Sequence, residues 1–119
     1  MVAVVVDDHR GSIELATYLL EHAGFEVKSY ANGAQALIAI TAEPPDVIVL
    51  DLALPGMDGC DLRNALATDP TLARIPIVVT SVHGVAERCP GLTDADFACC
   101  VRKPINPATF AATVRSVVS

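Results

Sequence analysis

The chain has 119 residues, the size of one ordinary domain and enough to bury a core without disulfides or metal ions, so we expect residues 1–119 to form a single domain. Hydrophobic residues make up 52% of the sequence and charged residues 18%, a composition that argues against a disordered chain. The net charge of −6, with no cluster of Lys and Arg, argues against direct binding to nucleic acid or to an anionic membrane, and the short apolar runs argue against a membrane span, so we expect a cytoplasmic protein.

Five short segments have the apolar, largely β-branched composition of strands. They are VAVVV (2–6), FEVKSY (25–30), DVIVL (46–50), PIVVT (76–80) and FACCV (97–101). Segments with helical periodicity lie between them, and three of the strands are uniformly apolar. This alternation predicts an α/β domain with a doubly wound parallel sheet that is buried on both faces.

Helix boundaries can be read from caps and periodicity. The first helix should end at Gly24, after apolar residues at three- and four-residue spacing. Asn32, Asp58 and Asn106 are expected to cap later helices, the last with Pro107 at its first position. The helix after Asn32 carries Ala34, Leu37, Ile38 and Ile40, and the helix after Asn106 carries Phe110, Val114 and Val117.

The fourth helix is the weak element of this pattern. Pro90 and Gly91 interrupt the segment after the fourth strand, so at most two turns fit between His83 and Cys89. We therefore expect a short or irregular helix there.

Four cysteines, Cys60, Cys89, Cys99 and Cys100, allow two bridges or one zinc site in principle. However, the sequence has no C-x-x-C pair, and adjacent residues in a strand point to opposite faces. The interpretation we favour is four free cysteines that serve as small hydrophobic residues in a reducing compartment.

Polar residues with a common chemistry follow four of the five strands. Asp7 and Asp8 follow the first, Asp51 the third, Thr80 closes the fourth, and Lys103 follows the fifth. Because parallel strands end at one edge of the sheet, where ligands bind in folds of this kind, we expect these groups to lie close together.

Three carboxylates in one place repel each other unless a cation lies among them. Such oxygen ligands suit Mg²⁺, which takes one or two carboxylates and bridges to phosphoryl groups. A lysine and a hydroxyl could then meet the remaining phosphoryl oxygens, and a carboxylate can itself be the nucleophile that forms an aspartyl phosphate. Asp51, alone at the end of the central strand, is the candidate for that role.

The sequence resembles the receiver domain of two-component response regulators along its whole length. The motifs that carry the resemblance are DDH, GFEVKSYANGAQAL, VIVLDLALPGMDG, PIVVTS and RKP, in that order and at family-like spacing. The resemblance implies a chemotaxis-regulator-like receiver with a five-stranded, flavodoxin-like sheet of strand order 2-1-3-4-5.

The resemblance also implies an acceptor and a metal site. Asp51 would accept a phosphoryl group from a phosphohistidine on a sensor histidine kinase or a histidine phosphotransfer protein. Asp8 and Asp51 would bind Mg²⁺ directly, Asp7 would assist through water, and the backbone carbonyl of Ala53 would complete the site.

Two further residues would read the state of the acceptor. Lys103 would contact the phosphoryl group, and Thr80 would move to hydrogen-bond it, which would switch the binding of a downstream protein or effector domain. The family's Lys-Pro peptide is commonly cis, so we also predict a cis Lys103–Pro104 bond.

The sequence departs from the family pattern near the readout. Cys100 stands where relatives carry Tyr or Phe, and the nearest aromatic residue, Phe97, should be part of the core. Ala53 and Val82 stand where many relatives have polar side chains that influence attack by water, so we expect a fairly long-lived phosphorylated form.

Other functions are less consistent with the sequence. An aspartyl phosphatase typically needs a second acid where Ala53 stands, and the acidic DDHR segment would repel a flavin phosphate. His9 and His83 are expected at the surface and not on a metal. The alternative that stays open is a receiver-like protein interaction module that no longer switches.

Overall fold

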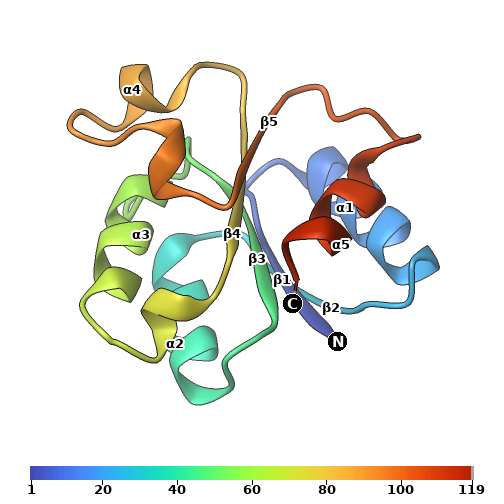
Figure 1. The fold of residues 1–119 in the computed structure, drawn as a ribbon, viewed down its shortest axis with the longest axis horizontal. Helices are drawn as coiled ribbons and strands as arrows, with labels where there is room; N and C mark the ends of the chain where they lie inside the picture. Colours follow the sequence, from blue (N-terminus) through green and yellow to red (C-terminus); the bar gives the residue numbers. More distant parts are fainter. Residues whose placement is uncertain (119) are drawn as a thin grey trace.

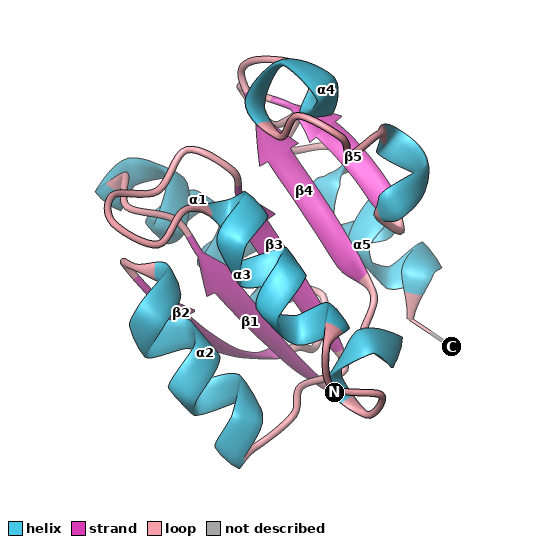
Figure 2. Cartoon of the chain, turned by 90° about the vertical axis from the view of Figure 1, so that its left-hand side faces the viewer, coloured by secondary structure: helices cyan, strands magenta, loops and turns pink. Residues whose placement is uncertain are grey.

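Residues 1–118, which the computed structural model describes, contain five strands in one sheet of order β2-β1-β3-β4-β5. The strands are β1 (Val2–Val6), β2 (Glu26–Tyr30), β3 (Val47–Asp51), β4 (Ile77–Ser81) and β5 (Cys99–Arg102). All the pairings are parallel, as the common direction of the arrows in Figure 2 shows. The predicted doubly wound α/β fold and its strand order are therefore confirmed.

Helices cover both faces of the sheet. They are α1 (Arg10–His22), α2 (Gly33–Ala42), α3 (Gly59–Ala67), α4 (Val85–Arg88) and α5 (Phe110–Val117), with short 3₁₀ turns at Leu72–Arg74 and Asp94–Asp96. In Figure 1 the sheet is seen near its β5 edge, with α1 and α5 on one side and α2 and α3 on the other. This layering buries the central strands on both faces.

Alternating strand residues feed separate apolar clusters. Ala3 and Val5 of β1 pack with residues of α1 and α5, whereas Val4 and Val6 pack with residues of α2 and α3. A third cluster lies near the end of β4 and contains Leu52, Val79, Val85, Cys89 and Phe97. The expectation that Phe97 belongs to the core is confirmed.

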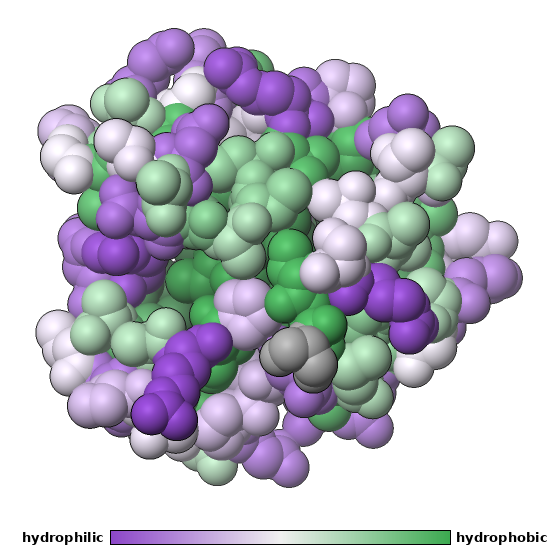
Figure 3. Space-filling view, viewed as in Figure 1, coloured by the Kyte–Doolittle hydropathy of each residue, from purple (hydrophilic) through white to green (hydrophobic). Residues whose placement is uncertain are grey.

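The strand at the edge is less buried than its neighbours. The residues of β5 are partly or fully exposed, while β3 is buried throughout. Cys99 packs on the α1 and α5 side and Cys100 on the side of Phe97, so the two adjacent cysteines do face opposite ways. Figure 3, viewed as in Figure 1, shows hydrophobic residues gathered in the middle of the molecule's surface, between more hydrophilic margins.

Two helix starts agree with the predicted caps. The side chain of Asn32 accepts a hydrogen bond from the N–H of Gln35, and Asp58 and Asp61 form a reciprocal capping box at the start of α3. Gly24 follows the end of α1 with a φ of +96°, a conformation that favours glycine.

Two details of the helices differ from the prediction. Helix α5 begins at Phe110 and not at Pro107. The Asn106 side chain does accept from the N–H of Ala108, as the predicted cap would, and its carbonyl accepts from Thr109 and Phe110 in the turn that precedes the helix. In α2, Ala36 and Ile40 are buried while Ile38 is 72% exposed. Helix α4 is a single turn, as expected from Pro90 and Gly91.

The prediction of four free cysteines is wrong for two of them. Cys60 of α3 and Cys89 at the end of α4 form a disulfide that links residues 29 positions apart. The fold brings the two side chains into one apolar cluster, and sequence spacing carries no sign of this pairing. Cys99 and Cys100 are free thiols within the described part of the chain.

Among residues 1–118, no helix is both long and apolar enough to cross a membrane.

Candidate functional site

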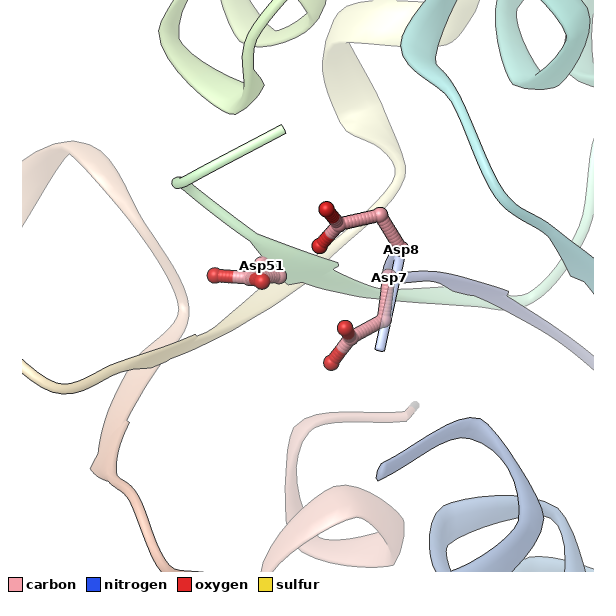
Figure 4. A group of neighbouring side chains, drawn as sticks. All are labelled: Asp7, Asp8 and Asp51. Carbon is pink, nitrogen blue, oxygen red and sulfur yellow. The ribbon is translucent and has the colours of Figure 1, made fainter. Parts of the chain in front are cut away.

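Three carboxylates meet at the edge of the sheet where the parallel strands end. Asp7 and Asp8 follow β1, and Asp51 is the last residue of the neighbouring strand β3. One oxygen of each lies within 4.8 Å of the others, and Figure 4 shows Asp7 and Asp8 at the end of β1 beside Asp51. The predicted convergence of these acids is therefore present.

Asp7 is buried, and both its oxygens accept hydrogen bonds. Oδ1 accepts from the N–H of His9 at 2.8 Å, and Oδ2 accepts from Nζ of Lys103 at 2.8 Å. Asp8, by contrast, is exposed. Of the two adjacent acids, Asp8 is thus the one open to a ligand from solvent.

Asp51 is 6% exposed, and each of its two oxygens has a hydrogen-bond donor beside it. Oδ1 accepts from the N–H of Ala53 at 3.1 Å, and Oδ2 lies 3.3 Å from Nζ of Lys103. Burial raises the pKa of Asp51 above its usual value, and the negative charge of Asp7 adds to this, against the opposing effects of the Ala53 N–H and Lys103. The carboxylate is therefore held in a site that needs more positive charge than Lys103 supplies.

Lys103 reaches the acids from the far edge of the sheet. Its backbone N–H donates to the carbonyl of Ser81 at 2.9 Å, which continues the pairing of β5 with β4. The predicted cis peptide between Lys103 and Pro104 is present. Burial lowers the pKa of Lys103, but the hydrogen bond and charge of Asp7, followed by the charge of Asp51, outweigh it and raise that pKa.

Thr80 is the register partner of Asp51 in the pairing of β3 with β4. It is 4% exposed and lies one residue before the end of its strand. The ends of four strands therefore bring together the acidic pair, Asp51, Thr80 and Lys103, as the sequence predicted.

A glycine lets β3 and α3 approach closely. A Cβ at Gly59 would lie 2.6 Å from Cα of Leu52 and 2.7 Å from the carbonyl oxygen of Asp51, both backbone atoms that a side chain cannot displace cheaply. Gly59 therefore lets the first turn of α3 pack directly on the residue that carries the carboxylate.

The charges of the site fit a divalent cation. The carboxylates of Asp7, Asp8 and Asp51 face the single ammonium of Lys103, which leaves two negative charges uncompensated. Oxygen ligands with this charge are the kind that Mg²⁺ prefers. The pKa of Asp51 is raised first by burial and then by the negative charge of Asp7, which a cation at this position would offset.

The remaining sequence predictions concern residues around the acids. Ala53 and Val82 are both exposed beside the site, and neither has a polar side chain. His9 and His83 are exposed as expected, and Nδ1 of His9 accepts from the N–H of Ser12 at the start of α1.

Sequence reasoning missed an apolar cavity beside the site. It has a volume of about 560 Å³ and lies between α1 and the segment that leads into α5. Asp7, Thr80 and Lys103 border it on one side, and Leu15 and Phe110 are among its apolar walls. Pro104 and Ile105, which precede the unpredicted start of α5, also border it.

Comparisons with known proteins agree with this geometry. The family model described as response regulator receiver domain matches residues 3–115. The response regulator PleD of Caulobacter vibrioides is 36% identical over 117 residues, which cover 96% of this chain and 25% of PleD. The phosphate regulon transcriptional regulatory protein PhoB of Rhizobium meliloti is 36% identical over 119 residues, 98% of this chain and 51% of PhoB.

Among solved structures, the chemotaxis response regulator CheY4 of Vibrio cholerae is similar with a TM-score of 0.87 and 26% identity, over 98% of each chain. The chain thus spans a quarter to a half of the curated relatives named above, and nearly all of CheY4. The match over most of its length shows that the chain belongs to the response regulator receiver domain family of two-component systems.

Proposed function

We propose that this receiver domain, taken as one domain over residues 1–119, accepts a phosphoryl group on Asp51. The donor is a phosphohistidine on a sensor histidine kinase or a histidine phosphotransfer protein. An oxygen of Asp51 forms the new bond to phosphorus as the bond from phosphorus to the imidazole nitrogen breaks. The observation that carries the proposal is the convergence of Asp7, Asp8 and Asp51 with Lys103, whose Nζ lies 3.3 Å from Asp51.

Mg²⁺ is the proposed cofactor. Asp8 and Asp51 would hold it directly, with the carbonyl of Ala53 as a further ligand, and Asp7 would assist through water. When bound, the ion neutralises the charge that gathers on the phosphoryl oxygens.

Lys103 and Thr80 have separate parts in this proposal. Lys103 donates to the phosphoryl oxygens, which requires its ammonium to share or leave Asp7. Thr80 hydrogen-bonds the phosphoryl group and so changes the position of the β4 end. Because the donor is already activated, positioning and charge neutralisation are sufficient catalysis, and the domain is a signalling phosphoacceptor that acts only on its own phosphorylation and dephosphorylation.

Receiver domains interact with histidine kinases and downstream effectors, and the chain here spans only part of the curated relatives. We propose a protein or effector-domain partner, a cytoplasmic location, and no direct contact with nucleic acid or membrane, consistent with the net charge of −6.

The lifetime of the phosphorylated form follows from two exposed apolar residues. Ala53 and the 62% exposed Val82 carry no group that can position a water molecule for attack on phosphorus. We therefore propose a fairly long-lived phosphoaspartate. A phosphate-release measurement that gave a half-life of only seconds would contradict this.

The test is phosphorylation of wild type and Asp51→Asn by acetyl phosphate with Mg²⁺, followed by intact mass. We expect the mass of one phosphoryl group on wild type and none on the variant. Asp46→Asn is the matched control, because Asp46 lies next to the opposite end of β3, where its side chain accepts from the N–H of Val2. Equal modification of wild type and Asp51→Asn would overturn the assignment.

The second candidate, an interaction module that does not switch, is favoured by Cys100 and by the single turn of α4. It predicts phosphorylation, or binding of beryllofluoride, with no change in NMR spectrum, oligomeric state or partner affinity. Chemical-shift changes that extend from Thr80 to β5 would reject it.

A further inference from the structure

The Cys60–Cys89 disulfide joins the two chain segments that leave the site. One segment begins at Asp51 and the other at its register partner Thr80, and each reaches its cysteine nine residues later. The two segments thus form a ring, closed at one end by the pairing of β3 with β4 and at the other by the disulfide. Any movement of one segment against the other is limited at both ends.

Besides the disulfide, the segment between β4 and β5 (residues 82–98), which we call the α4 segment, is held by Val85, Leu92 and Phe97 in the third apolar cluster and by hydrogen bonds next to β4 and β5 at its two ends. Helix α4 is one turn long, and its buried residue is Val85, with Cys89 buried at its end. Figure 1 shows α4 above α3, and in Figure 2 it lies beyond the ends of β4 and β5. The ion pair of Arg63 with Asp96, at 3.6 Å, is a second link to α3, and it is partly exposed.

The two cysteines differ in exposure to solvent. Cys60 is partly exposed in the first turn of α3, whereas Cys89 is 1% exposed within the third apolar cluster. An external thiol or disulfide therefore reaches Cys60 first, and Cys89 can act only on its neighbour. This is the arrangement of an attacked cysteine and a resolving cysteine.

We propose that Cys60 and Cys89 are a reversible thiol–disulfide exchange site, which takes a small disulfide such as glutathione disulfide as oxidant and fixes the α4 segment to α3 when oxidised. The Cys60 thiolate attacks the small disulfide and releases one small thiol. The Cys89 thiolate then attacks the Cys60 sulfur, closes the internal bond and releases the second thiol. Two protein thiols are oxidised, one disulfide is reduced to two thiols, and the reverse sequence opens the bond.

The other two cysteines are less suited to this exchange. Cys99 and Cys100 lie side by side in β5 and face opposite sides of the sheet. Burial, followed by the charge of Asp94, raises the pKa of the Cys100 thiol to about 11, which keeps it protonated at neutral pH. Oxidation should therefore select Cys60 and Cys89.

The first test uses the unphosphorylated protein in glutathione disulfide or in dithiothreitol, with free thiols counted after denaturation. We expect two free thiols in the oxidised protein and four in the reduced protein. Hydrogen exchange within residues 82–98 should be at least tenfold faster after reduction, with β1 and β3 unchanged. Cys60→Ser should exchange like the reduced protein in both buffers, and Cys99→Ser should behave like wild type.

Four thiols in both buffers, or equal exchange of residues 82–98 in both redox states, would overturn the proposal. Cys89→Ala provides a second variant without the bond, so a folding defect of one variant does not decide the outcome.

The consequence for signalling rests on the proposed function, and a second measurement separates the two. If Thr80 moves on phosphorylation, the reduced α4 segment can follow it and the oxidised segment cannot. Chemical-shift changes on adding beryllofluoride should therefore extend through residues 82–98 only in the reduced protein. Changes of equal extent in both redox states would overturn this consequence, whereas no response in either state would count against the proposed function and leave the exchange result standing.

Discussion

Lys103 donates from Nζ to Oδ2 of Asp7 over 2.8 Å, and this contact joins two residues that are 96 positions apart. Asp7 follows β1 and Lys103 follows β5, and strands β3 and β4 lie between those two strands. The lysine side chain therefore crosses the ends of β3 and β4. Both side chains are largely buried, at 17% and 6% exposure. The pair therefore links the middle of the sheet to its β5 edge, directly over Asp51.

Lys103→Met should destabilise the domain by about 3 kcal/mol at pH 7 in the absence of divalent ions, because it leaves Asp7 and Asp51 buried without a cation. The pKa of Lys103 is raised in the fold, so its stabilising effect is complete at neutral pH and is lost only above the usual lysine range. Urea unfolding measures the loss. Lys28→Met is the control, since its ion pair with Glu43 is exposed and should contribute much less. Equal losses in both variants would contradict this account.

Asp51→Asn should stabilise the metal-free domain at neutral pH, by on the order of 1 kcal/mol. The pKa of Asp51 is raised in the fold, mainly by burial. As pH rises from the usual range of an aspartate through this raised value, the unfolded chain releases the proton first, so wild type loses stability there. The variant should lack this loss, and the free energies of unfolding of variant and wild type should converge as pH falls below the usual pKa range of an aspartate. A variant no more stable than wild type at pH 7 would show that Lys103 already compensates the charge.

If Mg²⁺ is the cofactor, as proposed, it should stabilise wild type, because it would bind the folded arrangement of carboxylates and would have no comparable site in the unfolded chain. At ten times the dissociation constant the gain is about 1.4 kcal/mol. Asp8→Asn should lose most of this gain, since Asp8 is the exposed acid of the cluster. Urea midpoints in a magnesium titration measure it, with Asp69→Asn as a control outside the site. An undiminished gain in Asp8→Asn would remove Asp8 from the metal site.

Gly59→Ala should destabilise the domain by about 2 kcal/mol, because its Cβ would overlap backbone atoms of Asp51 and Leu52. Gly11→Ala is a suitable control. It lies in α1, and its Cβ would approach only the His9 side chain, at 3.3 Å, so the better helix propensity of alanine should make it neutral or slightly stabilising. Thermal unfolding of the two variants compares them directly. Similar melting temperatures would mean that α3 can shift away from β3 at little cost.

Reduction of the Cys60–Cys89 bond should lower the free energy of unfolding by about 3 to 4 kcal/mol, since the bond closes a loop with a separation of 29 residues in the unfolded chain. Denaturant unfolding with and without dithiothreitol measures this. Cys60→Ser should be insensitive to the reductant. A wild-type midpoint that did not change on reduction would show that the thiols do not pair in solution.

The strands could be predicted to within about two residues because each is a short apolar run between polar segments. The site could be predicted for a topological reason. Parallel strands end at a common edge, so Asp7, Asp51 and Lys103 had to converge once the sheet was parallel. Neither inference needed any knowledge of side-chain packing.

The disulfide and the start of α5 depend on packing. Cys60 and Cys89 meet only because α3 and the end of α4 share an apolar cluster, and cysteine spacing alone does not determine connectivity. Asn106 and Pro107 have the residues of a helix start, but the carbonyl of Asn106 closes a separate turn before Phe110. Local sequence signals therefore determine neither the cysteine pairing nor the first residue of α5.

The alternation of side chains along β1 continues past the end of the sheet, because the N–H of Asp7 still donates to the carbonyl of Tyr30 on β2. Asp7 follows Ala3 and Val5 toward α1 and α5, where Lys103 neutralises it, and the next residue, Asp8, stays exposed. Insertion or deletion of one residue within β1 would exchange these environments along with the two apolar clusters. Asp7 and Asp8 are chemically identical, and the alternation of side chains along the strand determines which of them is buried and which is exposed.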